Sequence, residues 1–150
     1  MEPSSIRKAT IADSKRIASL FDAYRQFYQQ APDLRLAQQF IEQRLSKQES
    51  SIFIAEDSTG KMIGFTQLYP SFCSVSAGSI YVLYDLFVMP DTRHHGVGRA
   101  LMRAAEAFAR SNGAVRMDLS TARKNEKAQG LYRSEGWVLD QEFLVFSKQL

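Results

Sequence analysis

The stretch YDLFVMPDTRHHGVGRALM, residues 84–102, joins an apolar strand pattern to the start of a helix pattern. Pro90 ends the apolar run, and two glycines, Gly96 and Gly98, stand where the helix begins. Glycine costs a helix about 1 kcal/mol relative to alanine, so two of them here call for a function. A glycine-rich turn before a helix gathers backbone N–H groups at the positive end of the helix dipole. The stretch therefore predicts an anion site, although a plain helix-capping turn would show the same pattern.

Basic side chains surround the two glycines, but the common phosphate-loop patterns do not fit them. The basic residues are Arg93, His94, His95 and Arg99. No Lys-Ser or Lys-Thr pair follows the second glycine, and no third glycine completes a dinucleotide fingerprint. Adjacent histidines on a turn point apart and no third ligand is spaced to join them, so we expect no metal site.

The helix after the glycines has the clearest pattern in the chain, and Asn112-Gly113 marks its end. Its apolar positions are Val97, Ala100, Leu101, Ala104, Ala105, Phe108 and Ala109. Further helix patterns cover 10–28, 34–47 and 125–136, and strand patterns cover 4–10, 51–57, 61–72, 79–89, 115–121 and, as one or two closing strands, 137–150. The order β-α-α-β-β-β-α-β-α-β predicts an α/β (mixed α+β) fold with a single central mixed β-sheet and helices on both faces.

Length and composition predict one domain over residues 1–150. The net charge of +3 suits an anionic ligand without indicating nucleic acid. The single cysteine, Cys73, excludes an internal disulfide, and we expect it to be a small apolar thiol in a strand. Residues 1–10 lack the apolar segment of a signal peptide and no apolar run is long enough to span a bilayer, so we expect a cytoplasmic protein.

Three motifs together resemble the GNAT superfamily of N-acetyltransferases. Arg93-x-x-Gly96-x-Gly98 resembles the Q/R-x-x-G-x-G/A loop that holds the pyrophosphate of acetyl-coenzyme A. Upstream, YDLFVMP resembles the family's fourth strand, and downstream NEKAQGLYRSEGW resembles its N-x-x-A-x-x-x-Y and Gly-aromatic signature. One departure is His94, where relatives often have glycine. The resemblance implies an acetyl-coenzyme A dependent N-acetyltransferase in which a primary amine attacks the thioester directly.

The resemblance also implies which residues bind the coenzyme. The fourth and fifth strands of the family splay apart at a bulge, and the pantetheine arm enters the gap and bonds to backbone groups. One backbone N–H of this segment would also polarise the acetyl carbonyl. The expected coenzyme-binding residues are Leu86, Phe87, Val88, Arg93, His94, His95, Gly96, Val97, Gly98, Arg99 and Asn125.

Two residues are expected to handle protons. Tyr132 matches the family tyrosine that protonates the leaving thiolate, and its alternative is a core aromatic. Asp85 is a carboxylate inside an apolar strand, which is costly unless it meets a polar partner. It is a candidate amine binder or base, with a purely structural hydrogen bond as the alternative. Strand alternation lets only Asp85 or Tyr84 face the acceptor unless a bulge intervenes.

The resemblance places the acceptor between the first helix and the strands, where Tyr24, Tyr28, Tyr69 and Tyr84 are candidate substrate-binding residues. It leaves open which primary amine is the acceptor, a small molecule or a protein amine. Since family members often pair, we expect a homodimer. Two rival functions are a non-catalytic acyl-CoA-binding module and a small basic nucleic-acid-binding protein. The first is disfavoured by the presence of Tyr132, and the second by the lack of a basic stripe interleaved with aromatics.

Overall fold

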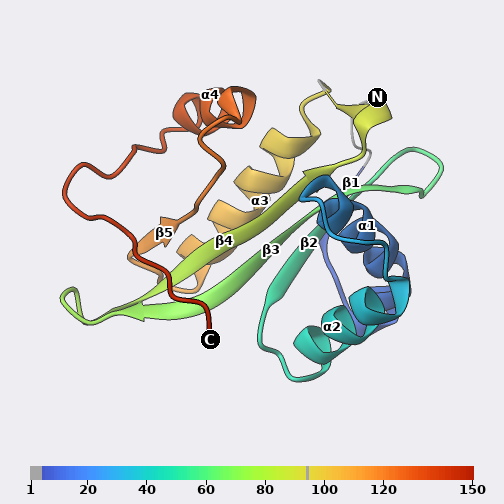
Figure 1. Cartoon of the computed structure of the whole chain (residues 1–150), viewed down its shortest axis with the longest axis horizontal. Helices are drawn as coiled ribbons and strands as arrows, with labels where there is room; N and C mark the ends of the chain where they lie inside the picture. The colour runs from blue at the N-terminus through green and yellow to red at the C-terminus, as the bar shows by residue number, and fades with distance from the viewer. Residues whose placement is uncertain (1–4, 94) are drawn as a thin grey trace. The chain divides into compact units, whose positions relative to one another are not determined.

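The computed structural model describes residues 5–93 and 95–150, which divide into two compact units, Met1–Ser120 and Thr121–Leu150. The first unit contains a five-stranded sheet in the order β1-β2-β3-β4-β5, antiparallel except for the parallel pair β4 and β5 (Figure 1). Its strands are β1 (Ser5–Lys8), β2 (Ser51–Glu56), β3 (Met62–Cys73), β4 (Gly78–Val88) and β5 (Arg116–Asp118). The mixed sheet that the sequence predicts is confirmed.

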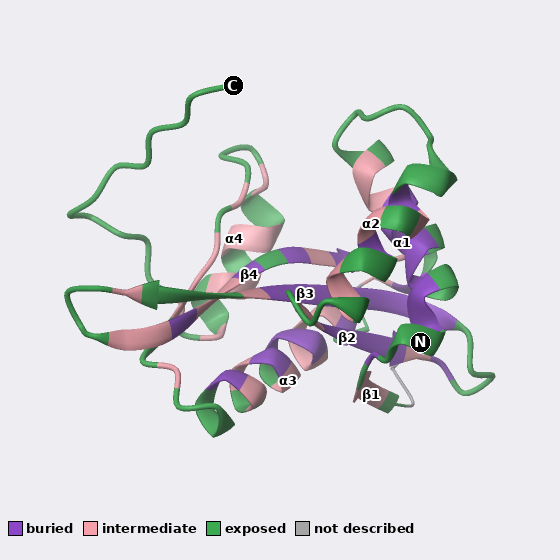
Figure 2. Ribbon diagram, turned by 90° about the horizontal axis from the view of Figure 1, so that it is seen from below, coloured by how far each residue is buried: buried purple, intermediate pink, exposed green. Residues whose placement is uncertain are grey.

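Helices cover both faces of this sheet. Figure 2 shows α1 and α2 on one face and α3 on the other. The helical elements of the first unit are η1 (Ile11–Asp13), α1 (Ser14–Phe27), α2 (Leu34–Ser46), η2 (Pro90–Thr92) and α3 (Val97–Ser111). The core under α1 and α2 includes Ile17, Phe21, Phe65 and Phe87, while α3 buries a stripe that includes Val97, Leu101 and Ala105. The amphipathic patterns of all three helices are therefore confirmed.

Gly64 on β3 sets the close approach of α3 to the sheet. A Cβ atom at this position would lie 3.0 Å from the carbonyl oxygen of Phe87 and 3.2–3.3 Å from side-chain atoms of Leu101 and Val97. These distances are shorter than most Cβ contacts, so a larger residue would require β4 or α3 to shift. The start of α3, and with it the glycine turn, is thus held against β3 and β4.

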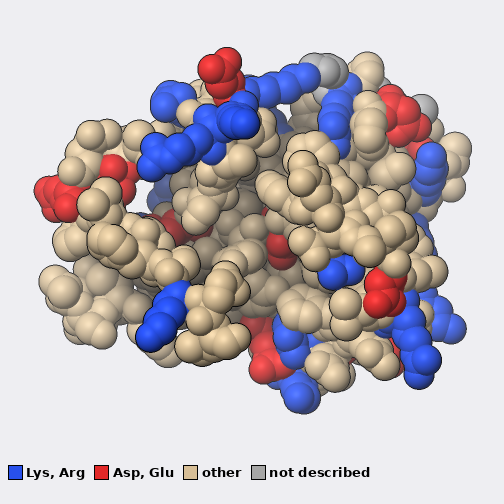
Figure 3. All heavy atoms as spheres, viewed as in Figure 1, with Lys and Arg blue, Asp and Glu red and all other residues tan. Residues whose placement is uncertain are grey.

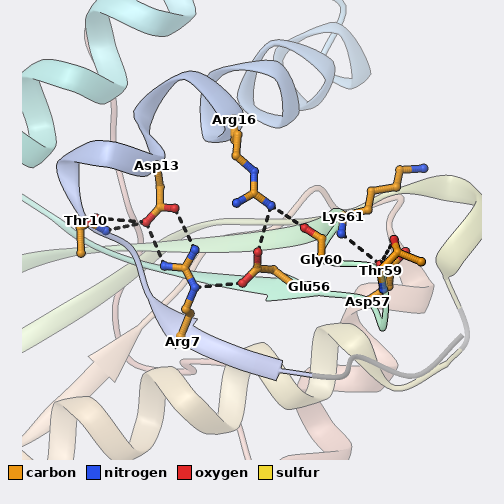
Figure 4. Close-up of polar contacts among 9 residues, drawn as sticks. All are labelled: Arg7, Thr10, Asp13, Arg16, Glu56, Asp57, Thr59, Gly60 and Lys61. Carbon is orange, nitrogen blue, oxygen red and sulfur yellow. Dashed lines mark hydrogen bonds and ion pairs between the residues drawn. The ribbon is translucent and has the colours of Figure 1, made fainter.

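A charged network ties β1 to β2 and to the start of α1 (Figure 4). The Arg7 guanidinium donates to both carboxylate oxygens of Asp13, at 2.8 and 2.9 Å, and to Glu56 at 2.9 Å. Arg16 donates to Glu56 at 2.9 Å and to the carbonyl of Gly60 at 2.7 Å. The hydrogen bonds from Arg7 lower the pKa of Asp13 to about 2. This network fixes β1, the edge strand of the sheet, to β2 and α1.

The second unit contains α4 (Glu126–Ser134) followed by a chain without helix or strand. The closing strands expected over 137–150 are therefore wrong. Their apolar side chains, which include Phe143, Val145 and Phe146, are largely exposed. β-Type residues form a strand only where a partner supplies ladder hydrogen bonds, and this unit offers no other strand. No helix in the described part of the chain is long and apolar enough to cross a membrane.

Candidate functional site

A register shift in β4 lies at the centre of the candidate site. Leu83 pairs with Leu68 of β3, but the next pair is Asp85 with Gln67, so Tyr84 is an extra residue without a partner on β3. Gln67 and Tyr69, two residues apart on β3, share a face. The Tyr84 ring contacts that of Tyr69 at 5.4 Å between centroids, and Asp85 bonds Gln67. The bulge therefore brings the neighbours Tyr84 and Asp85 to the same face.

The Asp85 carboxyl is buried and held by neutral donors. It is 5% exposed, and its Oδ2 accepts from Gln67 Nε2 at 2.8 Å. Burial raises the pKa of Asp85 above its ordinary range, and the hydrogen bonds from Gln67 and Tyr24 oppose that rise. Within residues 5–93 and 95–150, Asp85 makes no ion pair. Such a carboxyl suits a group that binds a cation or takes a proton.

Tyrosine side chains gather around this carboxyl from three elements. Tyr24 of α1 bonds Asp85, and Tyr28 contacts the Tyr24 ring at 5.1 Å between centroids. Burial raises the pKa of Tyr69, and the charge of Asp85 adds to the rise. The structure therefore brings the predicted residues Tyr24, Tyr69 and Tyr84 together beside Asp85, with Tyr28 beyond Tyr24.

The edge of β4 that faces β5 is open beyond the bulge. β5 pairs only with Ile80–Val82, whereas β4 continues to Val88. On the edge toward β3, Met89 N–H donates to the carbonyl of Ile63. The Val88 carbonyl accepts from the Arg93 side chain and has no bond to β3 in the described structure. Since backbone groups alternate between edges in antiparallel pairs, those of Leu86 and Val88 face the open edge and those of Phe87 face β3. Within the described part of the chain, no strand pairs with this edge of β4 beyond Val82.

The start of α3 has the features of an anion site. Gly96 precedes the helix with φ +76°, a left-handed conformation that favours glycine. No side chain among the described residues caps the helix and its first turn has no acidic residue, so the N–H groups of Val97 and Gly98 lie at a helix start that favours an anion. His95 is exposed, while His94 lies outside the described residues.

The Arg93 side chain packs against β4 and the end of α1. Its Nε donates to the Val88 carbonyl at 2.8 Å. Its guanidinium carbon lies 5.4 Å from the Phe87 ring centroid and 5.6 Å from that of Phe27. Arg93 therefore anchors the loop to β4 and to the end of α1.

The second unit contains two further predicted site residues, Asn125 and Tyr132. The Asn125 side chain accepts from Ala128 N–H at 3.1 Å and so caps α4. Tyr132 is half-buried, with its ring centroid 6.5 Å from that of Trp137. Gly136, which follows the end of the helix, adopts φ +88°, a left-handed conformation that favours glycine.

Sequence reasoning missed two features. Gln67 is a polar residue within the apolar run GFTQLY, and that contrast is a signal that could have drawn attention to it. Cys73 lies in a strand as expected, but the apolar surroundings expected for its thiol are wrong: its Sγ lies 3.5 Å from Ser76 Oγ and 3.6 Å from an Arg116 nitrogen. Hydrogen bonds from Ser76 and Arg116 lower the pKa of Cys73 to about 7. The sequence could not show that the hairpin and β5 supply these partners.

Charged side chains of both signs share the surface over α1 and α2. On the face drawn in Figure 3, Lys and Arg lie among Asp and Glu over these two helices. Among the residues that the structure describes, no three His, Cys, Asp or Glu side chains gather as metal ligands would.

Comparison with known proteins points to one family. Residues 16–137 match the model of the acetyltransferase (GNAT) family. An uncharacterised N-acetyltransferase, YhfO, of Bacillus subtilis is 48% identical over 142 residues, which cover 95% of each chain. A probable acetyltransferase of Haemophilus influenzae is 30% identical over 87% of this chain and 88% of that one. The crystal structure of a probable acetyltransferase superposes with a TM-score of 0.92 at 37% identity, over 97% of both chains.

Proposed function

The chain belongs to the GNAT family of acetyl-CoA-dependent acetyltransferases, and on that premise we propose that it acetylates a primary amine that binds as a cation beside Asp85. The carrying observation is that Asp85 is buried among neutral donors without a cation partner in the described structure. A buried charge without a counter-charge is costly. The ammonium group of an acceptor would supply that counter-charge.

The coenzyme would bind along α3 and β4. Open N–H groups at the start of α3 suit the pyrophosphate, and the left-handed Gly96 keeps the backbone accessible. The pantetheine amides would pair with the backbone groups of Leu86 and the N–H of Val88 at the open edge of β4, since the Val88 carbonyl already accepts from Arg93. An N–H of this segment would polarise the acetyl carbonyl. A crystal structure of an aminoglycoside acetyltransferase with CoA shares the fold, with a TM-score of 0.81.

The chemistry requires the acceptor nitrogen to lose two protons and the leaving thiolate to gain one. The acceptor enters as an ammonium ion and loses one proton to Asp85 before its nitrogen attacks the thioester carbon. The nitrogen–carbon bond forms, the carbon–sulfur bond breaks, and the coenzyme leaves as a thiolate. Tyr132 would protonate that thiolate and recover its own proton from the new amide nitrogen. Asp85 releases its proton to solvent, so the products are an amide, a thiol and one proton.

Three groups are proposed to hold the substrates in place. Asn125 would contact the coenzyme arm through its NH2 group, because its side-chain oxygen caps α4. Tyr69 and Tyr84 would pack against the acceptor, since aromatic faces attract a cation. Most of the rate gain would come from positioning, because direct transfer needs no covalent enzyme intermediate.

The family resemblance supports three further proposals, on domain organisation, cellular location and oligomeric state. The two units would form one acetyltransferase domain, since the family match runs from residue 16 to 137 across their boundary. The protein would be cytoplasmic and would pair as a homodimer, which sedimentation equilibrium would test.

The acceptor class is open to direct measurement. Relatives are named for aminoglycosides and for aminoalkylphosphonates, so a panel should include both, with polyamines, amino acids and peptide amines. Catalytic amounts of protein are mixed with acetyl-CoA and each amine, and release of the free thiol is followed. We expect release above the amine-free control with at least one class. Acetyl-CoA binding without turnover on any class would instead indicate a non-catalytic module.

A further inference from the structure

A chain of hydrogen bonds runs from the candidate base toward the surface. Ser50, which directly precedes β2, donates from Oγ to Gln67 Oε1 at 2.8 Å, and Gln67 Nε2 donates to Asp85 Oδ2 at 2.8 Å. The Gln67 side chain is fully buried, at 0% exposure, whereas Ser50 is half-buried. Each end of the buried carboxamide therefore has one partner.

A carboxamide between these partners can serve two protonation states. As observed, its NH2 group faces a carboxylate and its oxygen accepts from a hydroxyl. After a half turn about the Cγ–Cδ bond, its oxygen accepts from a protonated carboxyl and its NH2 group donates to the hydroxyl oxygen. A serine hydroxyl can play either part because it both donates and accepts. Oxygen and nitrogen exchange nearly equal positions, so the surrounding core need not repack.

We propose that Gln67, held by Ser50, is the positioning residue that lets Asp85 gain and lose a proton in each turnover without leaving a buried polar group unpaired. This inference rests on the proposed function, in which the proton comes from the acceptor ammonium. The proton moves from the ammonium nitrogen to Asp85, the carboxamide turns, and the reverse turn accompanies release of the proton to solvent. An unpaired polar group in this core would be costly in one of the two states.

The elements packed around Asp85 each bring polar or charged side chains near it. Tyr24 lies on α1, Tyr69 on β3 and Tyr84 on β4 itself. Arg44 of α2 lowers the pKa of Tyr69, against the larger effect of burial, and makes its ion pair with Glu49. In the described structure, the Asp85 carboxyl is bonded to Gln67 and Tyr24. Of these two side chains, Gln67 is the one in which a half turn of the carboxamide exchanges the NH2 donor and the oxygen acceptor.

The inference is tested by NMR titration of the substrate-free protein, with ¹³C in the Asp carboxyls and ¹⁵N in the Gln amides. In the parent protein, the Gln67 side-chain resonances should move with the same midpoint as the Asp85 carboxyl. In Gln67→Met the carboxylate loses a donor that stabilises its charged form, so its midpoint should rise by about one to two pH units. Ser51→Ala, one residue from Ser50 and without a side-chain hydrogen bond in the described structure, should leave it unchanged.

Two further measurements separate this inference from a structural role. Ser50→Ala should shift the Asp85 midpoint and Ser50→Thr should restore it, because threonine keeps the hydroxyl. The acid limb of kcat/KM for the acceptor should move upward in Gln67→Met, with the KM for acetyl-CoA unchanged. A Gln67 amide in the parent that ignores the Asp85 titration would overturn the inference, even if Gln67→Met does not fold. If no amine is acetylated, the proposed function is wrong. The titration of the substrate-free protein still tests the inference about Gln67, because it needs no acceptor.

Discussion

Tyr84 and Asp85 are neighbours in the chain, yet both side chains lie on the α1 face of the sheet because β4 carries one more residue than β3 at this point. A regular strand would have placed one of them against α3. The bulged residue Tyr84 also lies two residues after Val82, which forms the last pair of β4 with β5. One irregularity thus joins the carboxyl, the aromatic contacts and the open strand edge.

Gly96 should be required for coenzyme binding more than for folding. Its φ of +76° makes Gly96→Ala cost about 1–2 kcal/mol of stability. Gly113, after the other end of α3, has φ +74°, and an added Cβ atom has open space at both positions. Gly113→Ala is therefore a matched control with the same strain. Calorimetry should show roughly tenfold weaker acetyl-CoA binding for Gly96→Ala alone; equal affinity in both variants would remove the loop from the site.

Tyr132→Phe should lower kcat while the fold persists. The substitution removes only the hydroxyl and retains the ring beside Trp137. General acid catalysis contributes about 10²–10⁴-fold, so kcat should fall by that order with little change in Tm. Tyr81→Phe, on β4, serves as the control for loss of a tyrosine hydroxyl. A Tyr132→Phe protein with parent turnover at all pH values would show that another group protonates the thiolate.

Cys73 should react as a thiolate near neutral pH. Its pKa of about 7 lies below the usual value because Ser76 and Arg116 stabilise the charged form. The rate of alkylation by iodoacetamide should therefore rise with pH around a midpoint near 7. Ser76→Ala should move that midpoint upward, toward about 8.5. Because the chain has a single cysteine, mass spectrometry reads this site alone; a midpoint near 8.5 in the parent would contradict the geometry.

Asp13 should stabilise the fold at neutral pH and cease to do so in acid. Its pKa falls from 3.8 to about 2 on folding, so its contribution is full above pH 4 and is lost as the pH drops toward 2. Asp13→Asn should cost about 1–2 kcal/mol at pH 7, since part of Arg7 is exposed to solvent. Urea unfolding should show this difference shrinking between pH 4 and 2. A difference between parent and variant that stays the same size from pH 7 to pH 2 would contradict this role of Asp13.

Much of the fold was predictable because the spacing of apolar residues along the sequence indicates which face of a helix or strand is buried. The stripe from Val97 to Ala109 and the glycines that flank α3 determine a helix in any context, and the structure confirms it. The strand pattern of residues 137–150 was equally clear, but a strand also needs a partner, and the sequence does not show where one lies.

The sequence allowed individual residues of the candidate site to be predicted, but it did not show which of them contact one another. Asp85 stood out as a carboxylate in an apolar strand, and Gln67 carried a similar signal. Their hydrogen bond depends on the register between β3 and β4, which a bulge shifts by one residue. No local pattern predicts that shift. The contacts of Arg93 with β4 and α1 likewise depend on tertiary packing.

The most direct test is to measure kcat/KM for the acceptor amine, acetyl-CoA affinity and Tm of Asp85→Asn on one preparation. Asparagine keeps the shape of the side chain and an oxygen for Gln67, but it neither attracts a cation nor takes a proton. The account predicts a loss of about 10²–10⁴-fold in kcat/KM, with affinity for acetyl-CoA and Tm close to those of the parent. Parent-level turnover in a folded Asp85→Asn protein would contradict it.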